Sequence, residues 1–409
     1  MILPPVPLNR SHVCACAVLD QKKINIEDIY LSETYDFSGA ARYDKLNKYR
    51  TKSMIVIPME DEKKRVIGVL QLINALDGEG NIIPFDPEQE KIISALSSLA
   101  AITLNNNQLT KAVYDLLHSF VTVMVDAVEA RSPYNAHHTR SMVQYAEKFI
   151  DWLNSVNSEW KIPQEERDPF LMSVWLHDIG KLVTPLNIMD KATRLGDLEE
   201  RVKNRLDTAD LMERLRALEY PEEAEAAAAM REKLSRASEL IRKANTAVIL
   251  EDETVASLRE AAGIQCLRAD GAKGPLLLEN ELEALTVRRG TLTAGERKEI
   301  ERHVEYTWSL LSKMSFEGDY EKVPSWAAMH HEMLNGSGYP EHLHADRIPK
   351  EVRLITILDI YDALTGKRPY KPPMAPEKAF EILEDMCREG KLDRMILEEF
   401  KSSGAWKRD

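Results

Sequence analysis

The chain has few cysteines and no long apolar run. Its four cysteines form no CxxC pair and none of the dense spacings of disulfide-stabilised domains, which favours a reducing compartment and predicts a cytoplasmic protein. No stretch approaches the roughly 18 to 20 consecutive apolar residues of a membrane-spanning helix. The first residues lack the basic region and apolar stretch of a signal peptide. We therefore expect no membrane contact.

The sequence also lacks the positive charge of a nucleic-acid-binding protein. A formal net charge of −13 argues against DNA as a partner, because such binding requires a basic surface. The glycine-rich loops GxGxxG and GxxxxGK[ST], which bind nucleotide phosphates in two large protein classes, are absent. A phosphate-bearing substrate would therefore need local positive charge, such as a metal cluster.

At 409 residues the chain is long enough for two or three domains, and its first hundred residues predict a mixed α and β domain. Two apolar runs, KSMIVIPM and RVIGVLQLI, flank the polar segment EDEKK. This pattern predicts an antiparallel hairpin of two buried strands. A helix is predicted to follow, with Asp86 as its N-cap and Pro87 at its first position.

The predicted helix continues over residues 88–130, with a repeat typical of coiled coils. Steps of four and three residues lead through ten positions, of which seven are apolar and the polar three are contiguous. A 3.5-residue period predicts a parallel seam, and hence a homodimer, in which this helix connects an N-terminal and a C-terminal domain. The alternative is one long helix packed against its own domain. The ten positions are Ile92, Leu96, Leu99, Thr103, Asn106, Thr110, Val113, Leu117, Phe120 and Met124.

Residues 196–290 differ in composition from the segments on either side. They are rich in Glu, Arg, Ala and Leu, follow a helical period and are interrupted at Pro221. We interpret them as a helical insertion, forming a hairpin, with no catalytic cluster of its own.

Histidines and aspartates lie in apolar helical surroundings at several distant points of the chain. A carboxylate in such surroundings is costly unless it is paired or bound to a cation. A lone histidine of this kind is more often a core residue than a ligand, but here the motifs HDxGK, HHE followed by GxGYP, and DxxDAL followed by RPYK occur in order. Imidazole and carboxylate together suit iron, manganese or zinc. The candidate ligands are His138, His177, Asp178, His303, His330, His331 and Asp359.

The adjacent pair His330 and His331 also predicts a local backbone feature. Neighbouring side chains on a helix point about 100° apart, so two adjacent histidines can serve one metal only near a helix end or a distortion. The glycines of the segment NGSGYP that follows predict a sharp turn.

Residues 118–405 resemble an HD-GYP domain, an all-α phosphohydrolase module, through HD at 177–178 and GYP at 338–340. The resemblance implies two divalent metal ions, iron or manganese. It implies that Asp178 bridges both ions. The first ion would be completed by His138, His177 and Asp359, and the second by His303, His330 and His331.

The resemblance also implies an activity. Such enzymes hydrolyse cyclic di-GMP to pGpG, and in some cases on to GMP, by a metal-bridging hydroxide. It implies catalytic roles for Asp178 and Lys181, with Lys181 neutralising a phosphate oxygen. The alternatives are hydrolysis of another cyclic dinucleotide, such as 3′,3′-cGAMP, and a non-hydrolysing binding module. The implied substrate-binding residues are Lys181, Gly338, Tyr339, Pro340, Arg368 and Lys371.

Three features depart from the family pattern. Asn335 replaces an aspartate of the GYP loop, and we expect the turn to survive because asparagine can also cap it. The segment 132–136 carries no acid, which favours two metal ions over three. The insertion separates the HD motif from His303, and we expect it to loop out of the helical core.

Residues 1–105 resemble a GAF sensor domain, an α+β fold with an antiparallel sheet. The matching segments are NIEDIY at 25–30, GVLQLIN at 68–74 and the PF pair at 84–85. They correspond to the last two-thirds of such a domain, which places its first strand and helix before Met1. The nucleotide-binding NKFDE signature is absent, so the resemblance leaves open both an unknown ligand and a ligand-free dimerising scaffold.

Overall fold

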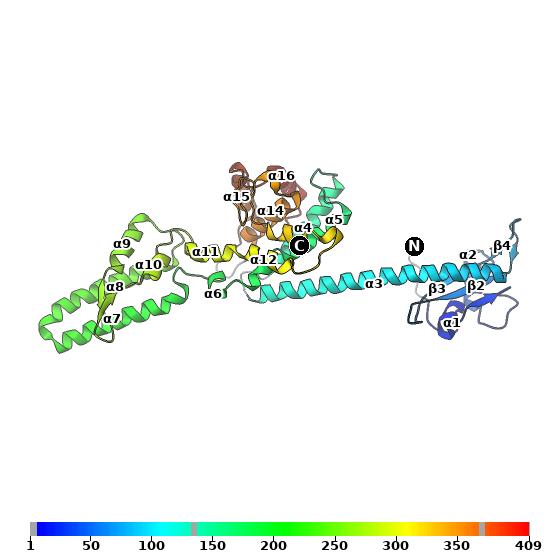
Figure 1. The fold of residues 1–409 in the computed structure, drawn as a ribbon, viewed down its shortest axis with the longest axis horizontal. Coiled ribbons are helices and arrows are strands. Elements are labelled where there is room, and N and C mark those ends of the chain that lie inside the picture. The colour runs from blue at the N-terminus through cyan, green and yellow to red at the C-terminus, as the bar shows by residue number, and fades with distance from the viewer. Residues whose placement is uncertain (1–5, 132–136, 368–372, 409) are drawn as a thin grey trace. The chain divides into compact units, whose positions relative to one another are not determined.

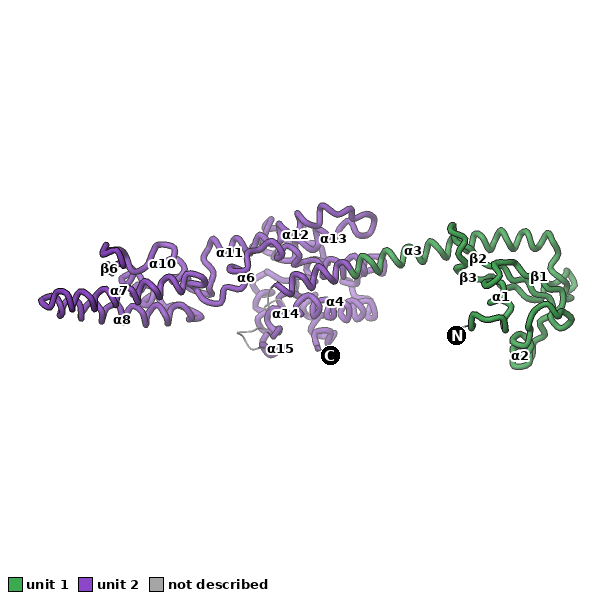
Figure 2. The backbone as a smooth tube through the Cα atoms, turned by 90° about the horizontal axis from the view of Figure 1, so that it is seen from below, with its two compact units in different colours: residues 1–119 green, residues 120–409 purple. Residues whose placement is uncertain are grey.

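The computed structural model describes residues 6–131, 137–367 and 373–408. It contains two compact units, Met1–Ser119 and Phe120–Asp409 (Figure 2). Arg368 and Lys371 lie outside the described residues, as does the segment 132–136. No helix in the described ranges is long and apolar enough to cross a membrane.

A three-stranded antiparallel sheet forms the centre of the first unit. Its strand order is β1–β2–β3, and the predicted hairpin is confirmed, with Ile57 opposite Leu70. A two-stranded hairpin, β4–β5, follows it. The elements are α1 (Val13–Asp20), β1 (Ile24–Ile26), α2 (Ser38–Asn47), β2 (Met54–Glu60), β3 (Val66–Ile73), β4 (Ala75–Leu76) and β5 (Ile82–Ile83).

Strand β2 is apolar on both faces because both faces of the sheet are covered. Met54 and Val56 pack in one cluster with Cys16 of α1. Ile55 and Ile57 point to the opposite face, where they pack with Ile93 and other apolar residues. Successive side chains of a strand point to opposite faces, so a strand that is covered on both faces is apolar at every position.

Helix α3 (Pro87–Arg131) begins where the sequence predicted. The carboxylate of Asp86 accepts hydrogen bonds from the backbone N–H groups of Glu88 and Gln89, each at 2.8 Å. The side chain of Gln89 in turn accepts from the Asp86 N–H at 3.0 Å. This reciprocal cap satisfies donors that the first helical turn leaves free, which fixes the start of the helix.

The apolar surface of α3 differs in phase from the predicted seam. Thr103 and Thr110 were predicted to lie on the seam, but the exposed apolar residues beside them are Ile102 and Leu109. A 3.5-residue repeat can alternate as three then four or as four then three, and the exposed apolar residues follow the other alternation. With Asn106 included, the exposed residues follow the heptad spacing continuously. We call this set the α3 stripe: Leu99, Ile102, Asn106, Leu109, Val113, Leu116, Phe120 and Val123.

Helices dominate the second unit (Figure 1). Its core contains aromatic residues from α4, α14, α15 and α16, including Phe149, Tyr361, Phe380 and Phe400. These contacts hold together helices that are distant in sequence. The helices outside the insertion are α4 (His138–Ser155), α5 (Gln164–Leu176), α6 (Leu186–Met189), α11 (Ala294–Glu301), α12 (His303–Leu311), α13 (Val323–Ala328), α14 (Lys350–Thr365), α15 (Pro376–Arg388) and α16 (Arg394–Ser403).

The insertion is built on the predicted helical hairpin, but it is not purely helical. Helices α7 (Glu199–Glu219) and α8 (Ala224–Thr246) lie side by side, and the break falls at Pro221 as expected (Figure 1). A short antiparallel pair, β6 (Gln265–Leu267) and β7 (Lys273–Pro275), contradicts the all-helical expectation. Helices α9 (Asp252–Ala262) and α10 (Glu279–Leu285) complete the insertion.

The turn between β6 and β7 had a signal in the sequence. Gly271 has a φ of +78°, and the Asp270 carboxylate accepts from the Ala272 N–H at 3.0 Å. The pair Asp270–Gly271 is a common hairpin turn, and it was overlooked because the surrounding period is helical.

The insertion has a hydrophobic core of its own, separate from the core of α4, α5 and α14. The fully buried Arg194 connects its two ends. The guanidinium donates to the carbonyl oxygens of Ala244 and Val287, each at 2.8 Å. Because Arg194 precedes α7 and Val287 follows α10, this contact closes the insertion at its base.

Candidate metal centre

All seven predicted ligands meet at one place in the second unit. Six of them are buried and His331 is half-buried. They come from segments that are far apart in sequence, at the start of α4, after α5, at the start of α12, after α13 and within α14. They are His138, His177, Asp178, His303, His330, His331 and Asp359.

Asp178 lies between two groups of histidines. Its Oδ2 is 3.7 Å from His138 Nε2 and 3.3 Å from His177 Nε2. Its Oδ1 is 3.4 Å from His303 Nε2 and 3.9 Å from His330 Nε2. Each carboxylate oxygen therefore faces a different group, which is the arrangement expected of a bridging ligand.

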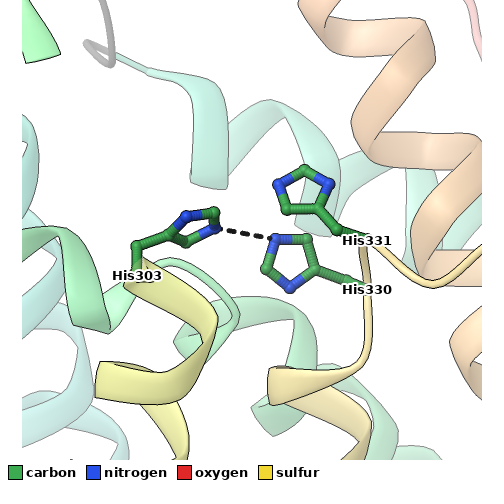
Figure 3. A group of neighbouring side chains, drawn as sticks. All are labelled: His303, His330 and His331. Carbon is green, nitrogen blue, oxygen red and sulfur yellow. Dashed lines mark hydrogen bonds between the residues drawn. The ribbon is translucent and has the colours of Figure 1, made fainter. Parts of the chain in front are cut away.

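The two groups are compact sets of ligand atoms. In the first, ligand atoms of His138, His177 and Asp359 lie within 4.8 Å of one another. In the second, the imidazoles of His303, His330 and His331 converge (Figure 3), and their ligand atoms also lie within 4.8 Å of one another. These two groups match the sets that the resemblance implied, and His177 and His330 also group with Asp178 between them.

The adjacent histidines satisfy the predicted backbone requirement. Helix α13 ends at Ala328, and His330 and His331 lie in the turn that follows. Outside a regular helix the two rings can converge, and their centroids are 4.1 Å apart.

Backbone carbonyl groups orient three of the imidazoles. In His177, His303 and His330, Nδ1 donates to the carbonyl oxygen three residues earlier at 2.7 Å, which leaves Nε2 facing the centre. A partner on one ring nitrogen fixes the tautomer and frees the other nitrogen to bind a metal. The accepting oxygens belong to Val174, Ile300 and Ala327.

His138 is oriented by a side chain that the sequence reasoning missed. Its Nδ1 lies 2.7 Å from Asp362 Oδ2, and Arg408 donates to Asp362 Oδ1 at 3.2 Å. Burial favours the neutral imidazole, but hydrogen bonds to Asp359 and Asp362 raise the pKa of His138 to about 9. Asp362 is the second aspartate of the motif DxxDAL and lies three residues after Asp359. Residues at this spacing share a face of a helix, so the sequence could have indicated that Asp362 lies beside the ligands.

Three other histidines and Asp178 have pKa shifts that favour the protonation states that metal binding requires. Burial lowers the pKa of His303 to about 3 and holds the pKa values of His330 and His331 below the ordinary value. Burial opposes ionisation of Asp178, but Lys181 and His177 hold its pKa well below the ordinary value. Neutral imidazoles and an ionised carboxylate are the forms that bind cations.

The residues of the centre fit a pair of divalent ions. Within the described ranges, His177 Nε2 and Asp178 Oδ1 are buried without a hydrogen-bond partner. An unpartnered buried polar atom costs about 1–3 kcal/mol. A cation beside each set would satisfy both atoms, and the nitrogen and oxygen donors suit iron, manganese or zinc.

Lys181 and Tyr339 lie at the edge of the ligand group. Lys181, in the short 3-10 helix η1 (Ile179–Leu182), has Nζ 2.6 Å from Asp178 Oδ2. The ring of Tyr339 lies 4.8 Å from that of His331, centroid to centroid. The predicted catalytic lysine and the tyrosine of GYP therefore both border the centre.

The two glycines of the GYP loop have different roles. Gly336 has a φ of +79°, which favours glycine. A Cβ on the buried Gly338 would lie 2.3 Å from the backbone nitrogen of Met333. Gly338 was an implied substrate-binding residue, and its close approach in the structure is to the loop's own backbone. Pro340 follows Tyr339 in the same loop.

Polar side chains hold this loop in place. Asn335 Oδ1 accepts from the Ser337 N–H at 3.1 Å, and its amide donates to the carbonyl of Glu389 at 3.0 Å, so the asparagine supports the turn as expected. The buried carboxylate of Glu332 accepts from the N–H groups of Glu341 and Leu343 at 2.7 and 2.9 Å. The sequence reasoning assigned no role to Glu332.

Two protein families match this chain. The HD domain family matches residues 273–396 and the GAF domain family matches residues 2–104. The first range includes His303, His330, His331 and Asp359. The other three candidate ligands, His138, His177 and Asp178, precede this range, and α7 and α8 lie between them and it in the sequence.

Curated relatives align with parts of the chain. The 3′3′-cGAMP-specific phosphodiesterase 3 of Vibrio cholerae is 36% identical over 102 residues, which are 25% of this chain and 22% of that protein. The cyclic di-GMP phosphodiesterase response regulator RpfG of Xanthomonas campestris is 33% identical over 102 residues, 25% of this chain and 26% of that protein. The cyclic di-GMP phosphodiesterase of Thermotoga maritima is 32% identical over 110 residues, 27% and 29% of the two chains. The chain spans less than a third of the length of each.

Proposed function

We propose that this chain, in which a GAF domain precedes an HD domain, hydrolyses cyclic di-GMP to pGpG. The observation that carries the proposal is the position of Asp178, whose two oxygens face two separate sets of ligands. Relatives from Xanthomonas campestris and Thermotoga maritima are named as cyclic di-GMP phosphodiesterases, which supports this choice of substrate.

The proposed cofactors are two iron or manganese ions. When bound, such a pair lowers the pKa of a shared water and neutralises charge on the attacked phosphate. Asp178 would contact both ions. Lys181, with its ammonium group 2.6 Å from Asp178, supplies positive charge for a non-bridging phosphate oxygen.

Residues at the edge of the centre would contact the rest of the substrate. The half-buried ring of Tyr339 offers an aromatic face for a base. Gly338 and Pro340 flank Tyr339, whose backbone N–H donates to the carbonyl oxygen of His331 at 3.2 Å and so holds it beside that residue. Arg368 and Lys371 remain proposed contacts of the second phosphate and guanine.

A second candidate substrate is 3′,3′-cGAMP. The relative from Vibrio cholerae that is 36% identical carries this specificity in its name. Cyclic di-GMP and 3′,3′-cGAMP differ in one base, so the phosphodiester chemistry at the centre is the same for both. Initial rates for the two dinucleotides, measured separately and in competition, decide between them, and a higher kcat/KM for 3′,3′-cGAMP would overturn the primary choice.

We also propose that the chain forms a parallel homodimer through the α3 stripe. Seven of its eight residues are apolar and exposed, and the eighth is Asn106. A single asparagine among apolar heptad positions is known to fix register and oligomeric state in two-stranded coiled coils. A second copy of the same helix is the occupant that this heptad pattern fits, and the GAF domain would act through it on the HD domain.

Turnover by the full chain tests the proposed activity. We expect purified protein to convert cyclic di-GMP to pGpG and Asp178→Ala to abolish conversion while the protein remains folded. Tight binding of the dinucleotide without turnover by metal-loaded wild-type protein would identify a non-hydrolysing binding module instead.

A further inference from the structure

The loop from Asp178 to Thr184 determines where the ammonium group of Lys181 lies. Its centre is the 3-10 helix η1, which contains four residues. A turn this short leaves most of its carbonyl oxygens without internal partners, so they need donors from elsewhere. The contacts around the loop therefore determine the position of Lys181.

One side of this loop is fixed by α12. Thr307 Oγ1 accepts from the Gly180 N–H and donates to the His177 carbonyl, both at 3.0 Å. A Cβ on Gly180 would lie 1.9 Å from the carbonyl oxygen of His303. The loop and α12 are thus in close contact, with no room for a side chain at Gly180.

The other side is held by one guanidinium group. Arg131 Nη1 donates to the carbonyl oxygen of Lys181 at 2.9 Å and also to that of Leu182, and Nη2 donates to that of Thr184 at 3.3 Å. The planar fork of an arginine suits several oxygens at once. Arg131 is the last residue of α3, the helix that carries the proposed dimer stripe.

We infer that Arg131 is a positioning residue that sets the place of Lys181 and connects α3 to the catalytic loop. The inference rests on the proposed function, in which Lys181 acts on the substrate phosphate. Because Arg131 contacts the backbone of Lys181 directly, a rotation or sliding of the end of α3 changes this contact. A change in α3 therefore reaches the lysine through the backbone of this loop.

Kinetics of Arg131→Gln test this inference, with Arg140→Gln as the matched control. Arg140 of α4 pairs with Asp126 of α3 and so also holds the end of this helix, but within the described residues its guanidinium makes no hydrogen bond to the loop. We expect Arg131→Gln to lower kcat/KM about tenfold or more at unchanged metal content. Arg131→Lys should restore part of this loss. An equal loss in Arg140→Gln would overturn the inference.

A double-mutant cycle distinguishes positioning of Lys181 from a general structural effect. In a Lys181→Met background, Arg131→Gln should cause no further loss, because its effect passes through the lysine. Full additivity of the two losses would contradict the inference. Should Arg131→Gln fail to fold, Arg131→Lys serves in the same cycle.

Hydrogen exchange gives a readout that does not depend on turnover. In Arg131→Gln, the amides of residues 179–184 should exchange about tenfold faster or more than in the wild type, while the amides of α12 should exchange at the wild-type rate. In Arg140→Gln, the amides of residues 179–184 should also exchange at the wild-type rate. Unchanged exchange would overturn the inference even in an active enzyme. If Arg131→Gln exchanges faster but the wild-type chain does not hydrolyse cyclic di-GMP, the proposed function alone would be refuted.

Discussion

The imidazole of His138 is held by Asp362, with Nδ1 2.7 Å from the carboxylate. Asp362 lies one turn after Asp359 in α14, so a single helix supplies both a candidate ligand and the support of another. Arg408 donates to the second oxygen of Asp362 and completes its hydrogen bonding. This contact directs His138 Nε2 toward Asp359, at 3.2 Å.

Substitution of this supporting carboxylate should weaken one metal site and spare the other. We expect Asp362→Asn to lower the affinity of the His138 set about 10- to 100-fold, because an amide orients the imidazole less firmly. The His303 set should bind as in the wild type. Titration of the metal-free protein with Mn²⁺ measures the affinities of both sets. The control is Asp151→Asn, which changes an exposed carboxylate that pairs with Arg167. Equal weakening of both sites would refute the assignment.

The two sites should differ in their dependence on pH. In the metal-free protein the pKa of His138 is raised to about 9, so at neutral pH this imidazole must lose a proton to bind an ion. Affinity of the His138 set should therefore rise by up to about tenfold per pH unit below 9. The pKa of His303 is about 3, so protonation of this residue should not weaken the other set near neutral pH.

Variants that keep one set each allow this comparison. His303→Ala retains the His138 set, and His138→Ala retains the His303 set. Mn²⁺ affinities of the two proteins at about pH 6.5, 7.5 and 8.5 should give a steep slope for the first and a shallow slope for the second. Two equal slopes would contradict the prediction.

The contact between the HD loop and α12 should tolerate no side chain at Gly180. A Cβ there would overlap the carbonyl oxygen of His303, so Gly180→Ala should lower the free energy of unfolding by about 1–3 kcal/mol or more. In contrast, a Cβ on Gly295 of α11 meets nothing within 4 Å. Gly295→Ala should be neutral or stabilising, because alanine favours helices. Thermal unfolding compares the two variants. Equal midpoints would show that the contact between the loop and α12 accommodates a side chain at Gly180.

Disulfide cross-linking decides the phase of the α3 stripe. Leu109 lies on the stripe and Thr110 beside it, so Leu109→Cys should form a disulfide-linked dimer on mild oxidation. Thr110→Cys should form little, and the chain without added cysteine gives the background. Efficient linkage through Thr110→Cys instead would restore the phase first predicted from the sequence, and linkage through neither would refute this dimer.

Local signals in the sequence predicted several elements correctly. The cap at Asp86, the hairpin of β2 and β3 and the break at Pro221 depend on neighbouring residues, so a short window contains the information. Five of the seven candidate ligands were found because HD, HHE and DxxDAL are unusual in apolar helices, and His138 and His303 because they lie in similar helical surroundings. Their division between two sets came from the family resemblance.

What the sequence did not predict depends on contacts over long distances. Asp362 and Arg408 are 46 residues apart, and no local pattern indicates that they share a hydrogen bond. Arg131 reaches a loop about fifty residues later. The phase of the seam on α3 is a separate case, because two alternations of the same period differ by only one residue along the chain.

The metal content of the Asp178→Ala variant tests the central claim most directly. Wild-type protein purified without oxygen should contain about two iron or manganese ions per chain, because two sets of ligands share this carboxylate. Asp178→Ala, measured beside it by elemental analysis, should lose most of both ions while keeping its helical circular dichroism. Full retention of two ions by the variant, or one ion or none in the wild type, would contradict a centre bridged by Asp178.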